Sequence, residues 1–335
     1  MYLSKKSLYL YAYFFLITFF ISFAVASRDI YDVPDTENYA NNFLGKTNLH
    51  IYHEFLFEFL TYLIRIFTDS YIIYFFIINF ILNFIILKIF IKISEIFYFD
   101  KFYFSIFSFG ILIFSSWYYV AATNGLRQGL ALVLAYYSFF IYLAYKKKLK
   151  SILLFVASCF FHYSNFLIVP FLFLYRLTFN KLFILLNVTG LFYVFGINEL
   201  IIKLVSESLS LPIYTSIKYY TQDGAESYRY GLQWDLFLYT VVFVYSYWWV
   251  CKFFLKENLY FINLVKFFYI LVFVYFIFGF AGFSNRYAVI SWFFSVFINC
   301  IILYSFLLKS KKSYFEFFFI AITLLSCIFF IYRFF

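Results

Sequence analysis

Charged side chains are scarce in this sequence. Only 13% of its 335 residues are Asp, Glu, Lys or Arg, whereas 66% are apolar. Soluble domains carry about 25% charged residues, so the composition excludes an ordinary soluble protein. The apolar residues gather in runs of about 20, the length of a helix that spans a bilayer. We therefore expect an all-α integral membrane protein, built as a polytopic bundle of transmembrane helices.

Cysteine is also rare, and the cysteines are dispersed. They stand singly in apolar segments, without paired spacing, at Cys159, Cys251, Cys300 and Cys327. This pattern excludes a disulfide framework and a cysteine-based zinc site. His50, His53 and Glu54 offer metal-ligand atoms, but no fixed fourth ligand accompanies them. We predict no metal and no cofactor.

Basic residues outnumber acidic ones by 26 to 16, which gives a formal net charge of +10. Such an excess occurs in nucleic-acid-binding proteins, but membrane proteins concentrate basic residues in their cytoplasmic loops. The second explanation fits an apolar chain, so we predict no nucleic-acid partner. The 58 Phe and 36 Tyr residues exceed what interfacial belts need and are expected to face lipid.

The lysines set the expected topology. Lys5 and Lys6 precede the first apolar run, residues 8–26, and place the amino terminus in the cytoplasm. The cluster Lys146-Lys147-Lys148-Leu149-Lys150 marks another cytoplasmic turn most firmly. Ala24-Val25-Ala26 resembles a signal-peptidase site, but the spans that follow favour an uncleaved anchor.

Alternation of apolar runs with basic loops predicts nine spans, at residues 8–26, 71–93, 102–122, 127–145, 182–204, 234–251, 261–281, 287–308 and 314–332. Residues 151–175 are apolar at both ends but polar in the middle. A single crossing there would put Arg176 and Lys181 outside and reverse every later basic loop. We therefore predict a re-entrant or broken-helix hairpin, with His162 at its buried tip.

Two polar stretches are expected on the outer side. Residues 27–69 form an outer loop that contains an amphipathic helix, 51–67, in which Glu54 and Glu58 share one face. Residues 205–234 form a second, long outer loop. Since no internal repeat or linker divides the chain, residues 1–335 are expected to form a single transmembrane domain.

The arginines are not distributed across the membrane in the same way as the lysines. On this topology six of them lie outside, namely Arg28, Arg65, Arg127, Arg229, Arg286 and Arg333. Because the guanidinium fork suits bidentate contacts with phosphate, we hypothesise an outward-facing phosphate or pyrophosphate site. In the alternative hypothesis, arginines pair with the outer acids Asp35, Glu54, Glu58, Asp223 and Glu226. Structural roles are expected for Arg28, Arg65 and Arg333.

Arg127 and Arg286 share a context. Each follows a polar turn, Thr123-Asn124-Gly125 or Ser284-Asn285, and opens a helix that leads inward. Two helix starts and two guanidinium groups could converge on one anion. His162 is either a satisfied histidine of the bundle or, at the hairpin tip, a substrate contact or proton acceptor.

Several short motifs occur together along the chain: Asp35-Thr36-Glu37-Asn38-Tyr39, the Glu54/Glu58 helix, Arg127-Gln128-Gly129-Leu130-Ala131, the basic turn, Phe161-His162-Tyr163-Ser164 with an apolar run to Pro170, and Asn285-Arg286-Tyr287. In this order and spacing they resemble the EpsG branch of the Wzy-type polysaccharide polymerases. The resemblance covers nearly the whole chain. Each motif is degenerate, so their order carries the resemblance.

The resemblance implies a metal-independent membrane glycosyltransferase, similar to the GT-C class, in the bacterial cytoplasmic membrane. At the outer face of the membrane, the enzyme would transfer a growing glycan from undecaprenyl pyrophosphate onto a fresh lipid-linked repeat unit. A flippase and a chain-length regulator would be its possible partners. Such a reaction needs stabilisation of the leaving pyrophosphate and activation of an acceptor hydroxyl.

The implied roles fall on the outer residues. Pyrophosphate contacts are assigned to Arg127 and Arg286, with Arg229 reaching from the long loop. His162 or Glu58 would act near the acceptor hydroxyl, and the sequence leaves both open. Asp35 would position sugar hydroxyls or an arginine. Further substrate contacts are assigned to Asn124, Gln128, Asn285 and Tyr287.

Other functions remain open at this stage. A membrane O-acyltransferase would use His162 with Asn165 and reach acyl-CoA from inside. A flippase or transporter of lipid-linked oligosaccharides would need an arginine-lined cavity open to both faces. A ligase that moves finished glycan to another acceptor would release the same pyrophosphate carrier.

Overall fold

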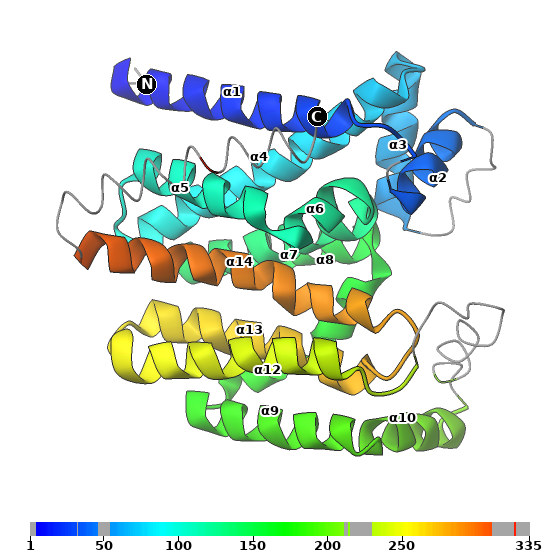
Figure 1. Cartoon of the computed structure of the whole chain (residues 1–335), viewed down its shortest axis with the longest axis vertical. Helices are drawn as coiled ribbons and strands as arrows, with labels where there is room; N and C mark the ends of the chain where they lie inside the picture. The colour runs from blue at the N-terminus through cyan, green and yellow to red at the C-terminus, as the bar shows by residue number, and fades with distance from the viewer. Residues whose placement is uncertain are drawn as a thin grey trace. The chain divides into compact units, whose positions relative to one another are not determined.

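The computed structural model describes residues 5–31, 33–45, 54–210, 214, 230–309 and 325 (Figure 1). Within this part of the chain all regular structure is helical, so the predicted all-α class is confirmed. Five helices are long and apolar enough to cross a membrane, or up to seven if each of two bent pairs counts as one span. The chain is therefore a multi-pass membrane protein.

The helices are α1 (Lys5–Ala26), α2 (Pro34–Phe43), α3 (Phe55–Phe67), α4 (Tyr71–Phe97), α5 (Lys101–Phe114), α6 (Ser116–Thr123), α7 (Leu126–Tyr145), α8 (Lys148–Phe161), the 3-10 helix η1 (Tyr163–Arg176), α9 (Phe179–Val194), α10 (Ile197–Ser208), α12 (Trp234–Trp249), the π-helical turn η2 (Val250–Phe254), α13 (Leu259–Phe278) and α14 (Ser284–Lys309). The predicted span 314–332 and the start of the predicted helix 51–67 lie outside the described residues.

Two predicted straight spans are wrong in shape. The run 102–122 is broken into α5 and α6, which meet at 80°, and the run 182–204 into α9 and α10, which meet at 86°. Local capping explains both breaks. The Ser115 hydroxyl accepts the N–H of Tyr118 and starts a new helix, while Gly196 takes a left-handed φ of 71° after α9.

The outer loop predicted at 27–69 holds one helix more than expected. Helix α2 begins at Pro34, where the missing N–H costs no helical hydrogen bond and the fixed φ suits a first turn. Helix α3 follows with a strongly amphipathic pattern, as predicted for 51–67. The loop therefore brings two helices, rather than one, to the region of the candidate site.

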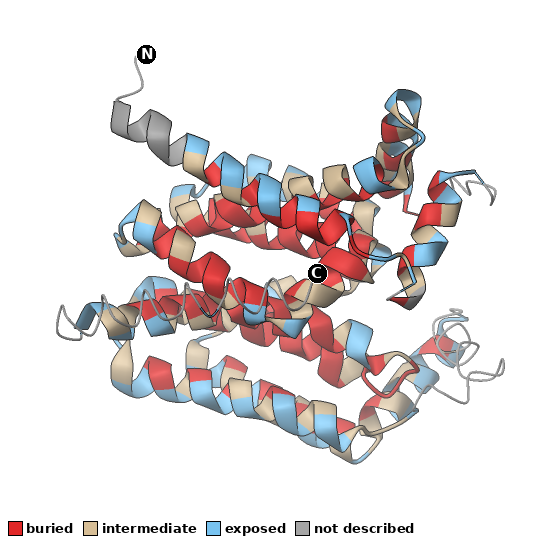
Figure 2. Ribbon diagram, turned by 45° about the horizontal axis from the view of Figure 1, so that its top comes forward, coloured by how far each residue is buried: buried red, intermediate tan, exposed pale blue. Residues whose placement is uncertain are grey.

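The chain divides into two compact units. Unit 1 comprises residues 1–165 and 299–335, and unit 2 comprises residues 166–298. In unit 1, α4 packs against α1 and α7, and α7 packs against α8. In unit 2, α13 packs against α9, α10 and α12. Buried residues are concentrated on α7 in unit 1 and on α13 in unit 2, while α1 and α9 carry many exposed ones (Figure 2).

Polar residues face inward in unit 1. On α1, Thr18 and Ser22 are fully buried, whereas Phe20 on the other face is 63% exposed. The Ser22 hydroxyl accepts a hydrogen bond from Asn83 Nδ2 at 3.0 Å, and Tyr118 donates to Asn83 Oδ1 at 2.9 Å. Apolar rings outside and hydrogen-bonded polar groups inside are the arrangement expected of helices packed within lipid.

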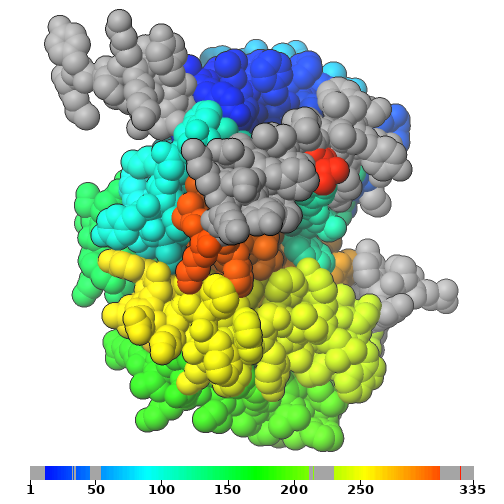
Figure 3. Space-filling model, turned by 60° about the vertical axis from the view of Figure 1, so that its left-hand side comes forward, coloured from blue at the N-terminus to red at the C-terminus, as the bar shows by residue number. Residues whose placement is uncertain are grey.

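Helix α12 shows the same outward apolar surface in unit 2. Its exposed side chains recur at helical spacing, at Leu238, Val242 and Trp249. Figure 3 shows α12 (yellow) at the surface, whereas most residues of α13 are buried. This stripe fits a lipid-facing helix.

The lysines and arginines lie at opposite ends within unit 1. At the end of α7, Glu95 Oε2 accepts from Lys92 Nζ at 2.6 Å and from the Tyr145 hydroxyl at 2.7 Å, and Lys101 Nζ donates to Oε1 at 3.0 Å. Arg127 lies in the first turn of α7, about 30 Å away along 20 residues of helix. In the described part of unit 1, Arg28 and Arg127 therefore lie at the end away from this lysine cluster, while which end faces the cytoplasm stays a prediction.

The predicted break at His162 is present. Helix α8 ends at Phe161, His162 is extended (φ −156°, ψ 122°), and η1 follows. Within unit 2, η1 lies along α13: the Phe171 ring stacks on Phe273, and Lys266 Nζ donates to the Tyr175 carbonyl at 2.7 Å. Since Lys266 precedes Phe273 on α13 while Tyr175 follows Phe171 on η1, η1 runs antiparallel to α13.

Candidate functional site

The candidate site is built around the turn between α6 and α7 in unit 1. The two helices approach so closely there that a Cβ on Gly129 would lie 2.5 Å from the Ala121 carbonyl oxygen. Only glycine fits this approach without a backbone shift. The close approach holds Arg127 at the start of α7, beside the polar turn that the sequence singles out.

Arg127 is paired with a carboxylate. Its Nη1 lies 2.7 Å from Glu54 Oε2, and its Nε donates to the Tyr39 hydroxyl at 3.3 Å. The guanidinium carbon also lies 5.6 Å from the centroid of the Tyr39 ring. Of the two hypotheses for Arg127, pairing with an outer acid is therefore the one present in this structure, and Glu54 is the acid.

Glu54 is held in an unusual position. The residue is only 8% exposed, and its backbone is left-handed (φ 58°, ψ 52°) immediately before α3. A non-glycine residue in this region costs about 1–3 kcal/mol, and such residues cluster at functional sites. The strain turns a carboxylate toward Arg127 rather than toward solvent.

His162 faces the other oxygen of the same carboxylate. Its Nε2 lies 3.5 Å from Glu54 Oε1, and its Nδ1 accepts the N–H of Ser164 at 3.1 Å. Because Nδ1 is an acceptor, the proton of a neutral ring resides on Nε2, toward Glu54. His162 thus orients Glu54 and is oriented by the start of η1.

Helix α2 is fastened to the same turn. The buried guanidinium of Arg28 donates from Nη2 to Thr36 Oγ1 and to the Thr123 carbonyl, both at 3.1 Å. The Asp35 N–H donates to Asn124 Oδ1, also at 3.1 Å. These bonds give Arg28 the structural role expected for it and place Asp35 and Asn124 beside Arg127.

Tyr39 supplies a hydroxyl that stays protonated near neutral pH. Burial raises the pKa of Tyr39 above its ordinary value, and the neighbouring Arg127 opposes the rise. The phenol therefore remains neutral beside Arg127 and Glu54. Its hydroxyl can still donate a hydrogen bond to an anion held by Arg127.

The remaining predicted residues are spread over both units. Glu58 is half-buried in the first turn of α3, one helical turn after Glu54, and Gln128 is buried in α7. Arg286 is exposed in the first turn of α14, within unit 2, with its guanidinium 4.3 Å from the centroid of the Phe283 ring.

The other residues of that turn are also more open than those around Arg127. Asn285 is exposed and Tyr287 is half-buried against Phe278. Arg229 lies outside the described residues. Convergence of Arg127 and Arg286 on one anion therefore stays a prediction.

The acyltransferase pair of His162 and Asn165 is absent. The Asn165 side chain is fully buried, and neither of its amide atoms makes a hydrogen bond. Its backbone N–H, rather than its side chain, contacts the His162 carbonyl at 3.1 Å. The His162 ring instead faces Glu54 and the Ser164 N–H, so the geometry does not favour an acyltransferase.

Sequence reasoning missed Glu54 and Tyr39 as members of the site. From the sequence, Glu54 was noted as the companion of Glu58, as a possible metal ligand beside His50 and His53, and as one of several possible arginine partners. The need of a partly buried Arg127 for an anion was the signal that could have singled it out. Among the described residues, no group of three His, Cys, Asp or Glu side chains could hold a metal ion.

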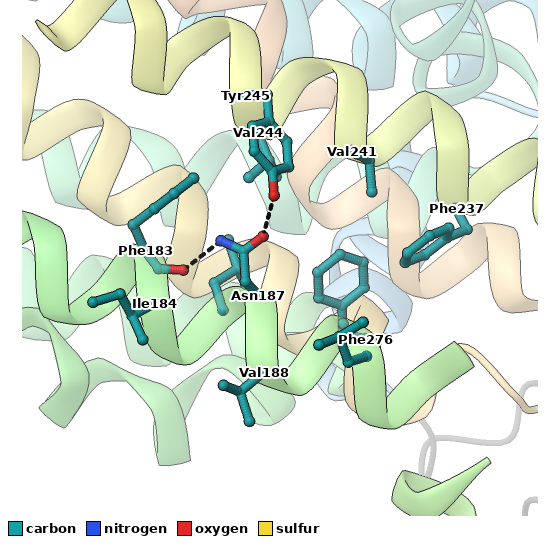
Figure 4. A pocket seen from close by; sticks show the side chains of 12 residues that line it. Phe183, Ile184, Asn187, Val188, Phe237, Val241, Val244, Tyr245 and Phe276 are labelled. Atoms are coloured by element: carbon teal, nitrogen blue, oxygen red, sulfur yellow. Dashed lines mark hydrogen bonds between the residues drawn. The ribbon is translucent and has the colours of Figure 1, made fainter. Parts of the chain in front are cut away.

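Unit 2 contains a cavity of about 490 Å³ between α9, α12 and α13, lined mostly by apolar residues (Figure 4). Its polar side chains satisfy each other: Tyr245 donates to Asn187 Oδ1 at 2.6 Å, and Asn187 Nδ2 donates to the Phe183 carbonyl at 2.7 Å. No charged group lines it. This cavity suits an apolar chain and offers no group for acid–base chemistry.

A comparison with protein families decides the relationship. A model of the EpsG family matches residues 11–335, nearly the whole chain. The chain belongs to the EpsG family. The EpsG family is associated with glycosyltransferase-like polymerases, so this EpsG chain is a membrane protein of the polysaccharide-polymerase type. No curated protein and no solved structure matches the chain.

Proposed function

We propose that this EpsG-family protein polymerises undecaprenyl-pyrophosphate-linked oligosaccharide repeat units at the outer face of the bacterial cytoplasmic membrane. The observation that carries the proposal is the cluster of Arg127, Glu54 and His162. It combines a guanidinium suited to a pyrophosphate with a carboxylate suited to a hydroxyl proton. The cluster lies at the end of unit 1 opposite the lysines, which is the outer end by the positive-inside rule.

Arg127 is proposed to bind the leaving group. In the reaction, an acceptor hydroxyl oxygen bonds to the anomeric carbon of the donor glycan while the bond from that carbon to the pyrophosphate oxygen breaks. The electron pair leaves with the pyrophosphate, where the guanidinium and the Tyr39 hydroxyl stabilise the added charge. Arg127 must exchange Glu54 for the pyrophosphate to do so.

That exchange would prepare Glu54 as the base. Once Arg127 turns to the pyrophosphate, the Glu54 carboxylate loses a neighbouring positive charge, and its affinity for a proton rises. Glu54 then accepts the proton of the acceptor hydroxyl while His162 Nε2 holds it in place. The hypothesis that His162 or Glu58 is itself the base stays a prediction, but both nitrogens of His162 already face partners.

The other predicted residues take supporting roles in this proposal. Asp35 and Asn124, which are linked at the turn, would contact sugar hydroxyls beside Arg127. Gln128, Asn285 and Tyr287 are proposed as further substrate contacts, and Arg229 and Arg286 as further pyrophosphate contacts. The bilayer is the medium for both lipid-linked substrates, with a flippase and a chain-length regulator as proposed partners.

Disruption of the gene tests the function in the cell. Single repeat units should accumulate on lipid carriers in the outer leaflet, and long surface chains should disappear. Mass spectrometry of extracted lipid-linked glycans, with an impermeant glycan label to assign the leaflet, reads both. Units trapped in the inner leaflet would contradict the proposal in favour of a flippase.

A further inference from the structure

A second polar cluster lies in unit 2, away from the residues used above. Glu199 is in the first turn of α10, directly after the bend that follows α9. Its Oε1 accepts hydrogen bonds from the Tyr214 hydroxyl at 3.1 Å and from the Tyr230 hydroxyl. The cluster therefore joins one carboxylate to two phenols that are far apart in sequence.

The frame around this cluster is firmly tied. Buried Asn198 donates from Nδ2 to the carbonyls of Thr189 at 3.1 Å and of Phe276 at 2.8 Å. Those bonds fix the start of α10 against α9 and α13. The glutamate at position 199 is thus presented by a rigid helix bend rather than by a loose loop.

The residues that face Glu199 are tied as well. The Gly231 N–H donates to the Phe280 carbonyl at 2.8 Å, with Gly231 at a φ of 84°. The Tyr214 N–H donates to Ser206 Oγ at 2.9 Å. Tyr230 meets Phe280 edge to face at 6.2 Å, yet its side chain remains 41% exposed. One ring of the cluster is therefore held in place and still available to a ligand.

Among the described residues, Lys203 lies near the cluster on α10, whereas Lys181, Lys252 and Lys256 lie at the other end of unit 2. Lys252 and Lys256 line a cavity beside the start of α9, at the opposite end of that helix. Helix α9 has 16 residues, so the two ends are about 24 Å apart. The chain returns from Phe280 to Arg286 at the same end as Tyr230. By the positive-inside rule this is the outer end.

The chemistry of the cluster selects the ligand. Within the described residues Glu199 forms no ion pair, not even with Lys203 one turn further along α10, so its own negative charge disfavours an anion such as pyrophosphate. A carboxylate accepts hydrogen bonds and does not donate them. Burial, together with Glu199, raises the pKa of Tyr230, so that hydroxyl stays protonated and keeps donating to the carboxylate. The ligand must offer donors and an apolar face for the Tyr230 ring.

A sugar ring meets both requirements. Its hydroxyls donate to a carboxylate, and its C–H face packs against an aromatic ring. We propose that Glu199, Tyr214 and Tyr230 form a sugar-binding subsite for the glycan part of a lipid-linked substrate, distant from its pyrophosphate. That the glycan is part of a lipid-linked substrate rests on the proposed function. The existence of the subsite does not, because sugar binding can be measured without polymerisation.

Binding of a pyrophosphate-free glycan tests the subsite. The probe is the oligosaccharide released by mild acid from lipid-linked glycans of the gene-disrupted cells, titrated by calorimetry into the full chain in lipid nanodiscs. Glu199→Gln and Tyr230→Ala should each raise Kd about tenfold. Tyr230→Phe, which keeps the ring and loses the hydroxyl, should raise it about threefold.

Tyr245→Ala is the matched control. Tyr245 is a comparably exposed tyrosine of unit 2 whose hydroxyl also bonds a side chain, but it lies in the apolar cavity of Figure 4. This variant should bind the glycan as the wild type does. Wild-type Kd values in all three cluster variants, or an equal loss in Tyr245→Ala, would overturn the subsite.

Two further measurements separate the possible failures. A carboxylate beside aromatic rings could also bind an organic cation. Binding of tetramethylammonium that Glu199→Gln abolishes, without any binding of the glycan, would overturn the sugar assignment. Arg127→Lys should bind the glycan with unchanged Kd while losing polymer. If the wild type binds the glycan but makes no polymer, the proposed function fails and the subsite stands.

Discussion

At the scale of single residues, the account depends on what Arg127 does with its guanidinium fork. Arg127→Lys keeps the positive charge but cannot contact two oxygens in one plane. Polymer formation should fall at least tenfold, as measured by gel analysis of surface glycan in cells that carry the variant. Arg176→Lys, at an exposed arginine of η1, is the matched control and should leave polymer unchanged. Wild-type polymer from Arg127→Lys would exclude a bidentate role.

The two glutamates of α3 can be distinguished in the same way. Glu54→Gln removes the proposed base and leaves Arg127 without its carboxylate, so the polymerisation rate should fall at least 100-fold. Glu58→Gln, one helical turn further on, should cost less than tenfold. Single-turnover assays on purified variants, with thermal unfolding as a check of folding, read both. The opposite order of effects would assign the base to Glu58.

The residue scale is also where prediction from sequence was least complete. The chemical types around Arg127 were foreseen, since Asp35, Asn124 and His162 were all singled out. The pairing with Glu54 was not, because residues 54 and 127 meet only through the packing of α3 on the rest of unit 1. A left-handed backbone at a glutamate likewise leaves no local pattern in a sequence.

At the scale of elements, the contact between α6 and α7 explains the glycine of the Arg127-Gln128-Gly129 motif. Gly129→Ala would push a methyl group to 2.5 Å from the Ala121 carbonyl oxygen, so the helices must separate. We expect a loss of about 1–3 kcal/mol in stability, seen as a lower melting temperature of the purified protein.

Gly125→Ala is the control for that experiment. The backbone there has a φ of −106°, and the nearest atom to an added Cβ is 3.6 Å away, which is an ordinary contact. This variant should melt close to the wild-type temperature. Equal melting of Gly129→Ala and the wild type would show that the helix contact is looser than described.

The break at His162 is the element that the sequence predicted best. Its prediction came from lysines far along the chain, because a straight crossing would have reversed every later basic loop. The bends at Ser115 and Gly196 were missed, since one capping hydroxyl or one left-handed glycine breaks an apolar run that composition alone reads as continuous.

Labelling tests the direction of that broken element. Tyr163 is 41% exposed beside His162, and the described cysteines Cys159, Cys251 and Cys300 are buried. In a Cys327→Ser background, an impermeant maleimide added to intact spheroplasts should label Tyr163→Cys from outside. Lys150→Cys should react only after lysis. Labelling of Tyr163→Cys only after lysis would reverse the topology.

At the scale of the whole molecule, the sequence was sufficient to predict the fold class and the family. Apolar runs predicted an all-α multi-pass protein, and the order of short motifs predicted the EpsG relationship that the family match confirms. The number of spans was less predictable. Eight of the nine predicted spans fall within the described residues, whereas five helices there, or up to seven elements if each bent pair counts as one, are long and apolar enough to cross a membrane.

The division into two compact units has no marker in the sequence, since the boundary at residues 165 and 166 falls within an apolar run and not in a linker-like stretch. Within unit 1, a lysine cluster lies at one end of the helices and Arg127, Glu54 and Tyr39 lie at the other. By the positive-inside rule the second end is predicted to face outward, as a reaction at the outer membrane face requires. A transporter would instead need polar groups reachable from both faces.

The central claim is that the protein itself joins lipid-linked repeat units, and reconstitution tests it most directly. Purified protein in liposomes would receive only undecaprenyl-pyrophosphate-linked repeat units isolated from the gene-disrupted cells. The account predicts a ladder of glycans that grow by whole repeat units, with one undecaprenyl pyrophosphate released for each new bond, and no ladder with Glu54→Gln. Units that cross the bilayer without growing longer, or a ladder undiminished in Glu54→Gln, would contradict it.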